Sequence, residues 1–159
     1  MFRKRPDIDM FRFERQAGLT LHQACIAGVD EAGRGPLAGP VVAAAGLFPA
    51  GIRLPGLKES KQLSPQRREH FYRLIHSQAL SIGVGLTCAA EIDRVNILQA
   101  SLQAMARAVS RMRQTPDFLL IDGIFPVPLS LPQRVLKKGD CRSHTIAAAS
   151  VVAKVVRDR

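Results

Sequence analysis

Apolar residues along the chain occur in short runs that are separated by polar, glycine-rich or proline-rich stretches. Runs of this length between turn-forming residues are typical of buried strands, and an alternating run is typical of a strand with one exposed face. Five segments fit these patterns, at residues 25–30, 40–48, 80–87, 118–122 and 133–136. The stretch 124–132 holds three prolines and is predicted to be a loop.

Three other segments carry apolar residues at helical spacing. One begins at Ser64-Pro65, where a hydroxyl can cap the helix and proline suits the first turn. The second covers about 96–112, and the third, rich in alanine and valine, covers 143–159. Residues 1–22 show no clear period and are interpreted as a loosely attached N-terminal extension.

The alternation of strands and helices predicts an α/β domain of three layers. The first two strands are joined without a helix, which predicts some antiparallel pairing. A chain of 159 residues fits one domain, assigned here to 23–159, and 47% hydrophobic residues suffice for a core.

The charge of the chain favours a polyanionic partner. Lys and Arg number 23 against 13 acidic residues, a net charge of +10, and bound phosphates would release counterions. An anionic membrane would attract the same charge, but no apolar run of about 18 residues could span a bilayer. No secretory signal is recognised, and three distant cysteines without a C-x-x-C pair favour a reducing compartment. We therefore expect a soluble, cytoplasmic monomer.

Two apolar strands run directly into carboxylates. Asp30 and Glu31 follow the first, and Asp122 follows the fourth. If the two strands are parallel and adjacent, these acids meet at one edge of the sheet, and Asp140 can join them. Carboxylate oxygens suit Mg²⁺ or Mn²⁺, and two such ions about 4 Å apart can drive phosphodiester hydrolysis.

The alternative is that Asp30 and Asp122 are turn or cap residues, which is the better interpretation of either alone. Both together, on so basic a chain, favour the metal site. Gly33-Arg34-Gly35 follows the first acids, and glycines there would let backbone N–H groups approach a phosphate or a ribose. The nucleotide-binding loop G-x-x-x-x-G-K-[ST] is absent, so Asp30-Glu31-Ala32 is not a helicase box.

The thirteen residues DEAGRGPLAGPVV at 30–42 resemble the signature of the bacterial type 2 ribonucleases H, ribonuclease HII. Further matching motifs follow in the same order, at 59–64, 91–93, 96–100, 120–123, 138–140, 146–150 and 153–155. The resemblance covers the chain from about residue 26 to its last residue. It implies the ribonuclease H-like fold, a mixed five-stranded sheet flanked by helices. It also implies hydrolysis of the RNA strand of RNA–DNA hybrids and cleavage on the 5′ side of ribonucleotides embedded in duplex DNA.

The resemblance also implies roles for individual residues. Four metal-binding or catalytic acids would be Asp30, Glu31, Asp122 and Asp140. Asp158, a rival for the fourth, is interpreted as a solvated helix-end residue. Gly33, Arg34 and Gly35 would contact the ribose 2′-hydroxyl and nearby phosphates, and Lys61 would hold a phosphate. His144 could act as a general acid, but a partly exposed histidine at a helix start is the favoured interpretation. Tyr72 is expected to be structural.

Two features depart from the family pattern. Lys58-Glu59 stands where Asn-Asp is more usual, and the chain ends at Arg159 within a helix. Family members continue with further helices, including a tyrosine that packs on the DNA–RNA junction, so a C-terminally truncated form is expected. Two alternatives remain open: a hybrid-binding form without catalysis, and a Mg²⁺-dependent recombinase-like or integrase-like nuclease on the same fold.

Overall fold

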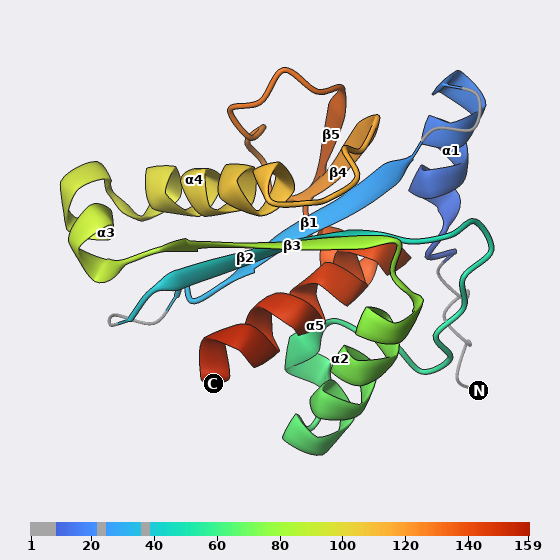
Figure 1. Ribbon diagram of the computed structural model, residues 1–159, viewed down its shortest axis with the longest axis horizontal. Coiled ribbons are helices and arrows are strands. Elements are labelled where there is room, and N and C mark those ends of the chain that lie inside the picture. The colour runs from blue at the N-terminus through green and yellow to red at the C-terminus, as the bar shows by residue number, and fades with distance from the viewer. Residues whose placement is uncertain (1–8, 22–24, 36–38) are drawn as a thin grey trace, which may run out of the picture.

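The computed structural model describes residues 9–21, 25–35 and 39–159. Its centre is a five-stranded sheet in the order β3-β2-β1-β4-β5 (Figure 1). The strands are β1 (Ile26–Ala32), β2 (Val41–Leu47), β3 (Ser81–Thr87), β4 (Phe118–Asp122) and β5 (Gln133–Leu136). The α-helices are α1 (Arg12–Leu21), α2 (Pro65–Gln78), α3 (Ala89–Val95), α4 (Ile97–Ser110) and α5 (His144–Asp158). Two 3-10 turns, η1 (Ser60–Gln62) and η2 (Gly139–Cys141), complete the described elements.

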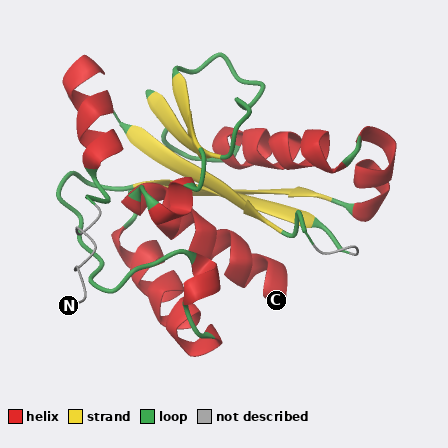
Figure 2. Cartoon of the chain, turned by 180° about the vertical axis from the view of Figure 1, so that it is seen from behind, coloured by secondary structure: helices red, strands yellow, loops and turns green. Residues whose placement is uncertain are grey.

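The sheet is mixed, as the sequence predicts. β2 pairs antiparallel with β1 and with β3, whereas β4 pairs parallel with β1 and with β5. Helix α4 covers one face, and α5 covers the other with α2 packed outside it (Figures 1 and 2). Each face has its own apolar cluster, so the domain has three layers. In the part of the chain that the structure describes, no helix is long and apolar enough to cross a membrane.

All five predicted strands and the three predicted long helices are present. Ser64 caps α2 as expected, because its Oγ accepts from the backbone N–H of Arg67 at 3.2 Å. Two details differ from the prediction. A separate short helix, α3, precedes α4, and β1 continues to Ala32, so Asp30 and Glu31 lie within the strand and pair with β2.

The prediction of a loosely attached N-terminal segment is wrong for the described residues of α1. Phe13 is buried, and its ring lies 4.6 Å and 4.9 Å from the guanidinium carbons of Arg134 and Arg142. Glu14 reaches the start of α5, where its Oε1 accepts from the backbone N–H of Thr145 at 3.2 Å and from its hydroxyl at 3.0 Å. Helix α1 therefore both fills a small apolar cluster and caps α5.

Gly28 lets α5 lie against the centre of the sheet. A Cβ at this position of β1 would come within 2.3 Å of the Thr145 carbonyl carbon and 2.5 Å of the Ile146 nitrogen. These are backbone atoms, which cannot rotate away as the end of a flexible side chain could. Without a side chain at residue 28, the first turn of α5 packs directly on β1.

We predict that Gly28→Ala lowers the free energy of unfolding by about 3 kcal/mol or more, because the added methyl group forces α5 away from the sheet. Urea denaturation measures this loss. Gly35→Ala is the matched control, since a Cβ there has no atom within 4 Å, and it should change stability by less than about 0.5 kcal/mol. Equal losses in the two variants would contradict the close packing at Gly28.

His144, the first residue of α5, is buried, with 6% of its surface exposed. The expectation of a partly exposed histidine is therefore wrong. Its ring stacks on Phe11 with centroids 4.6 Å apart, and its Nε2 has no hydrogen-bond partner among the described residues. Burial lowers the pKa of His144 to about 4, so the ring is neutral in the folded protein at neutral pH.

This burial makes stability depend on pH in a definite direction. Between pH 6.5 and 4 the unfolded chain binds a proton at His144 and the folded chain does not, so stability falls as the pH falls through this window. We expect the free energy of unfolding to fall by up to about 3 kcal/mol across this window because of His144, and His144→Phe should remove this loss. Denaturant titrations at several pH values measure the slope. His70 is exposed, so His70→Gln is the control variant and should leave the pH dependence of stability unchanged. An unchanged pH dependence in His144→Phe would show that His144 does not cause it.

Candidate metal centre and its cleft

The carboxylates predicted at the strand ends meet where β1 extends beyond β4. The parallel pairing of these strands ends at Val29 opposite Ile121, so Asp30 and Asp122 are the next residues on adjacent strands. Oxygen atoms of Asp30, Glu31 and Asp122 all lie within 4.8 Å of one another. Neighbouring parallel strands thus bring together Asp30 and Asp122, which are 92 positions apart in the sequence.

These three acids repel one another in a place that is partly shielded from water, since Asp30 is buried and Glu31 and Asp122 are partly exposed. Asp30 is only 3% exposed, and its pKa is raised well above the usual value by burial, and further by the charges of Asp122, Glu31 and Asp140. The pKa of Glu31 is also raised, first by burial and then by Asp122. Such a group of carboxylates is costly unless protons or a cation offset the charge.

One buried carboxylate oxygen among the three acids accepts no hydrogen bond from the described residues and is available to bind a cation. Asp122 Oδ1 accepts from the backbone N–H of Gly139 at 2.6 Å, and Asp30 Oδ1 accepts from that of Glu31 at 2.8 Å. By contrast, Glu31 Oε2 is buried and has no hydrogen-bond partner among the described residues. An all-oxygen set with an orphaned buried oxygen suits Mg²⁺ or Mn²⁺.

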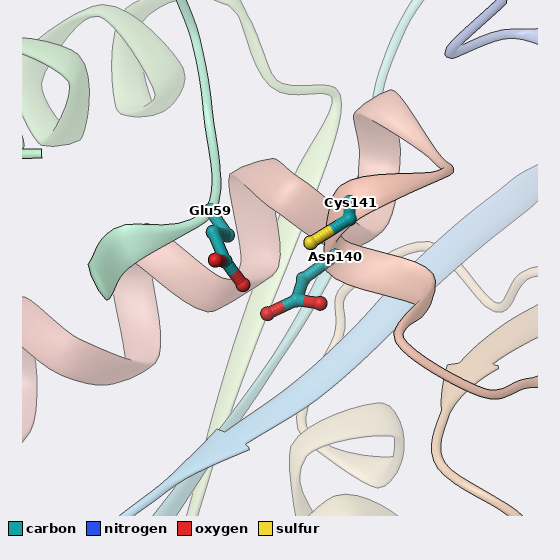
Figure 3. A group of neighbouring side chains, drawn as sticks. All are labelled: Glu59, Asp140 and Cys141. Atoms are coloured by element: carbon teal, nitrogen blue, oxygen red, sulfur yellow. The ribbon is translucent and has the colours of Figure 1, made fainter. Parts of the chain in front are cut away.

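Asp140 lies at the same cleft but belongs to a second group. A carboxylate oxygen of Asp140, one of Glu59 and the Cys141 sulfur all lie within 4.8 Å of one another (Figure 3). Glu59 directly precedes η1. Burial, a hydrogen bond with Glu59 and the charge of Asp122 together raise the pKa of Asp140 to about 7, and burial is the largest of these causes. The same hydrogen bond lowers the pKa of Glu59. Asp140 is therefore tied to Glu59 as well as facing the other acids.

The acids lie in a cleft of about 570 Å³ whose other walls are basic. The predicted substrate-binding residues Gly33, Arg34, Gly35 and Lys61 all line it. Gly33 has a φ of +96°, and a Cβ there would come within 2.6 Å of the Pro40 carbonyl oxygen. Only glycine fits this turn, which holds the backbone close to the carboxylates.

Helix α5 contributes cleft residues that the sequence reasoning did not single out. Ser150, Lys154 and Arg157 line the cleft, and their spacing of four and then three residues puts them on one face of the helix. Lys154 Nζ lies 3.0 Å from Asp158 Oδ1, and Arg157 Nε donates to the Pro40 carbonyl at 3.1 Å. The helical spacing of these polar residues within an otherwise apolar helix is the pattern from which they could have been predicted as site residues.

Two other candidates lie elsewhere. Asp158 pairs with Lys154 near the end of α5 and does not line the cleft, in keeping with a solvated helix-end residue. His144 packs against Phe11 and is also absent from the cleft walls, which leaves no geometric support for a general acid role. Tyr72 packs against the α2–α5 apolar cluster, as expected for a structural residue.

We predict that Asp30→Asn stabilises the metal-free protein by about 1–3 kcal/mol, because it replaces a buried carboxyl group whose ionisation is opposed by burial and by the neighbouring acids. The same substitution should reduce the rise in melting temperature that Mn²⁺ produces in the unmodified protein. Thermal melts in chelator and in Mn²⁺ measure both effects. Asp158→Asn is the exposed control, and a destabilised Asp30→Asn with an undiminished Mn²⁺ response would contradict the site.

Comparisons with known proteins identify relatives of this chain. The family model of ribonuclease HII matches residues 27–159. A ribonuclease HII of Geobacter metallireducens is 61% identical over 134 residues, which cover 84% of this chain and 63% of the relative. The chain therefore spans less than two thirds of that protein's length.

Solved structures show the same fold. The ribonuclease H2 of Pyrococcus horikoshii superposes with a TM-score of 0.72 at 30% identity, covering 84% of this chain and 72% of that one. A Bst-RNase HIII structure in complex with Mn²⁺ has a TM-score of 0.65 at 20% identity, with 89% and 54% covered, a likeness of fold alone. Together with the match of the family model to 133 residues, from 27 to 159, these findings establish that the chain belongs to the ribonuclease HII family.

Proposed function

We propose that this chain carries the catalytic site of a metal-dependent endoribonuclease. Its substrates would be RNA–DNA hybrids and duplex DNA with embedded ribonucleotides, cut on the 5′ side of the ribonucleotide to leave 3′-hydroxyl and 5′-phosphate ends. The observation that carries the proposal is the group of Asp30, Glu31 and Asp122, of which Asp30 is buried, in a cleft that Arg34, Lys61, Lys154 and Arg157 also line. Family membership agrees with it.

The three acids would hold Mn²⁺ or Mg²⁺, with two ions per site when substrate is bound, and Asp140 would complete the catalytic set. Bound ions of this kind lower the pKa of a water molecule and stabilise the leaving oxygen. The backbone N–H groups of Gly139 and Asp140 fix Asp122 Oδ1 at 2.6 Å and 3.4 Å. The protein thereby holds one carboxylate in place before any ion arrives, which favours a preorganised site.

The basic wall of the cleft would position the nucleic acid. Arg34, Lys61, Lys154 and Arg157 surround the acids, so phosphates on either side of the cut can be held while the scissile phosphate faces the carboxylates. The turn at Gly33-Arg34-Gly35 brings backbone close to the same place, where it can contact the ribose 2′-hydroxyl, the group that distinguishes RNA from DNA. The proposed partner is a nucleic acid duplex bound by a monomer.

A labelled DNA duplex with one ribonucleotide in one strand tests this proposal. We expect a nick on the 5′ side of the ribonucleotide in Mn²⁺ or Mg²⁺ and none in EDTA. Asp122→Asn should reduce the rate by at least about a thousandfold, because the metal site loses a ligand, while Asp158→Asn stays within about twofold of the unmodified protein.

An all-DNA duplex distinguishes the alternatives. Its cleavage at a similar rate would favour a DNA nuclease instead. Binding of the hybrid by folded protein without any metal-dependent cleavage would favour a hybrid-binding form without catalysis.

A further inference from the structure

Two large apolar side chains are exposed directly beside the carboxylates. Among the described residues, the exposed large hydrophobics are Leu80, Leu86, Ile124 and Phe125. Ile124 is 61% exposed and Phe125 is 44% exposed, and they are consecutive in the sequence. We call this pair the apolar step. Two such side chains next to each other at the edge of a polar site offer an apolar contact surface to a ligand that enters the site.

The apolar step is held at the metal centre by its place in the chain. It follows Asp122 and Gly123, and a φ of +128° at Gly123 turns the chain out of β4. Ile124 and Phe125 line a shallow niche with Glu31 and Arg34, backed by α4. Glu31, Arg34 and Asp122 line both this niche and the catalytic cleft, so the two surfaces are continuous.

We propose that the apolar step packs against the sugar and base of a substrate nucleotide close to the scissile phosphate. This inference rests on the function proposed above and extends it to a second kind of contact. Phe125 lies three positions after Asp122, which limits their Cα separation to about 10 Å, or roughly three nucleotide steps of 3.4 Å. The contacted nucleotide therefore lies within about three positions of the cut.

The chemistry of the two surfaces is complementary to a nucleic acid strand. The basic cleft can hold phosphates, but neither Ile124 nor Phe125 has a polar side chain, so the step is suited to the apolar faces of sugars and bases. Stacking of this kind tolerates any base. A protein partner is a poorer occupant, because two side chains are far smaller than the roughly 1,000 Å² that a specific protein interface needs.

Binding measurements test the step without relying on cleavage. In the Asp30→Asn background, we expect Phe125→Ala to raise the Kd for a ribonucleotide-containing duplex about tenfold, as measured by fluorescence anisotropy. Phe125→Leu should recover part of the affinity. Leu80→Ala is the matched control, since Leu80 is 54% exposed but precedes β3 at the opposite end of the sheet from the carboxylates. Circular dichroism checks that each variant is folded.

The dependence of the Kd on salt separates an apolar contact from a phosphate contact. Lys61→Ala should reduce the slope of log Kd against log salt concentration by about one, whereas Phe125→Ala should shift the line without changing its slope. In the catalytically intact protein, Phe125→Ala should raise KM about tenfold and leave kcat within about twofold.

An unchanged Kd in folded Phe125→Ala, or a loss no larger than that of Leu80→Ala, would overturn the proposal. So would a reduced salt slope in Phe125→Ala. Failure of the proposed function is distinguishable, because it appears as absent cleavage by the unmodified protein. The anisotropy comparison would still decide whether Phe125 contacts the duplex.

Discussion

The constraint that governs the site is that several acidic side chains lie close together and largely shielded from water. Asp30 is almost fully buried, and Glu31, Asp122 and Asp140 all raise its pKa or that of a neighbour. A fold selected for stability alone would not keep this group, because each unpaired buried charge weakens it. The group makes physical sense as a site that is completed by cations, and the basic cleft around it has the charge needed to bring a polyanion there.

Neutral packing elsewhere maintains this arrangement. Helix α5 presents a nearly continuous buried surface of alanine and valine, and Gly28 allows that surface to rest on β1. The same helix carries Lys154 and Arg157 to the cleft, and its capped start is adjacent to η2, which carries Asp140. The contact between Gly28 and α5 thus sets the distance between the carboxylates on the sheet and the cations on the helix. Helix α1 fixes the same end of α5, because Glu14 binds the backbone N–H of Thr145.

Much of this architecture could be predicted from local pattern. The strands carry uniform or alternating apolar runs, and the long helices carry stripes that only one packing direction can bury. The acid group could be predicted because both Asp30 and Asp122 follow such runs. The packing of helix α1 could not be predicted in this way, because only Phe13 and Ala17 are described as buried. The hydrogen-bond partner of Glu14, Thr145, lies 131 positions later in the sequence. Helix α3 has no buried residue at all, and the pairing of Asp140 with Glu59 arises only from tertiary structure.

The central claim is that Asp30, Glu31 and Asp122 form the divalent-metal site. Anomalous scattering from crystals of the protein grown with Mn²⁺ tests it most directly, since the signal locates the ion without reference to activity. The account predicts a peak about 2.1 Å from oxygen atoms of these carboxylates. A peak found only among Glu59, Asp140 and Cys141, or none in either group at saturating Mn²⁺, would contradict it.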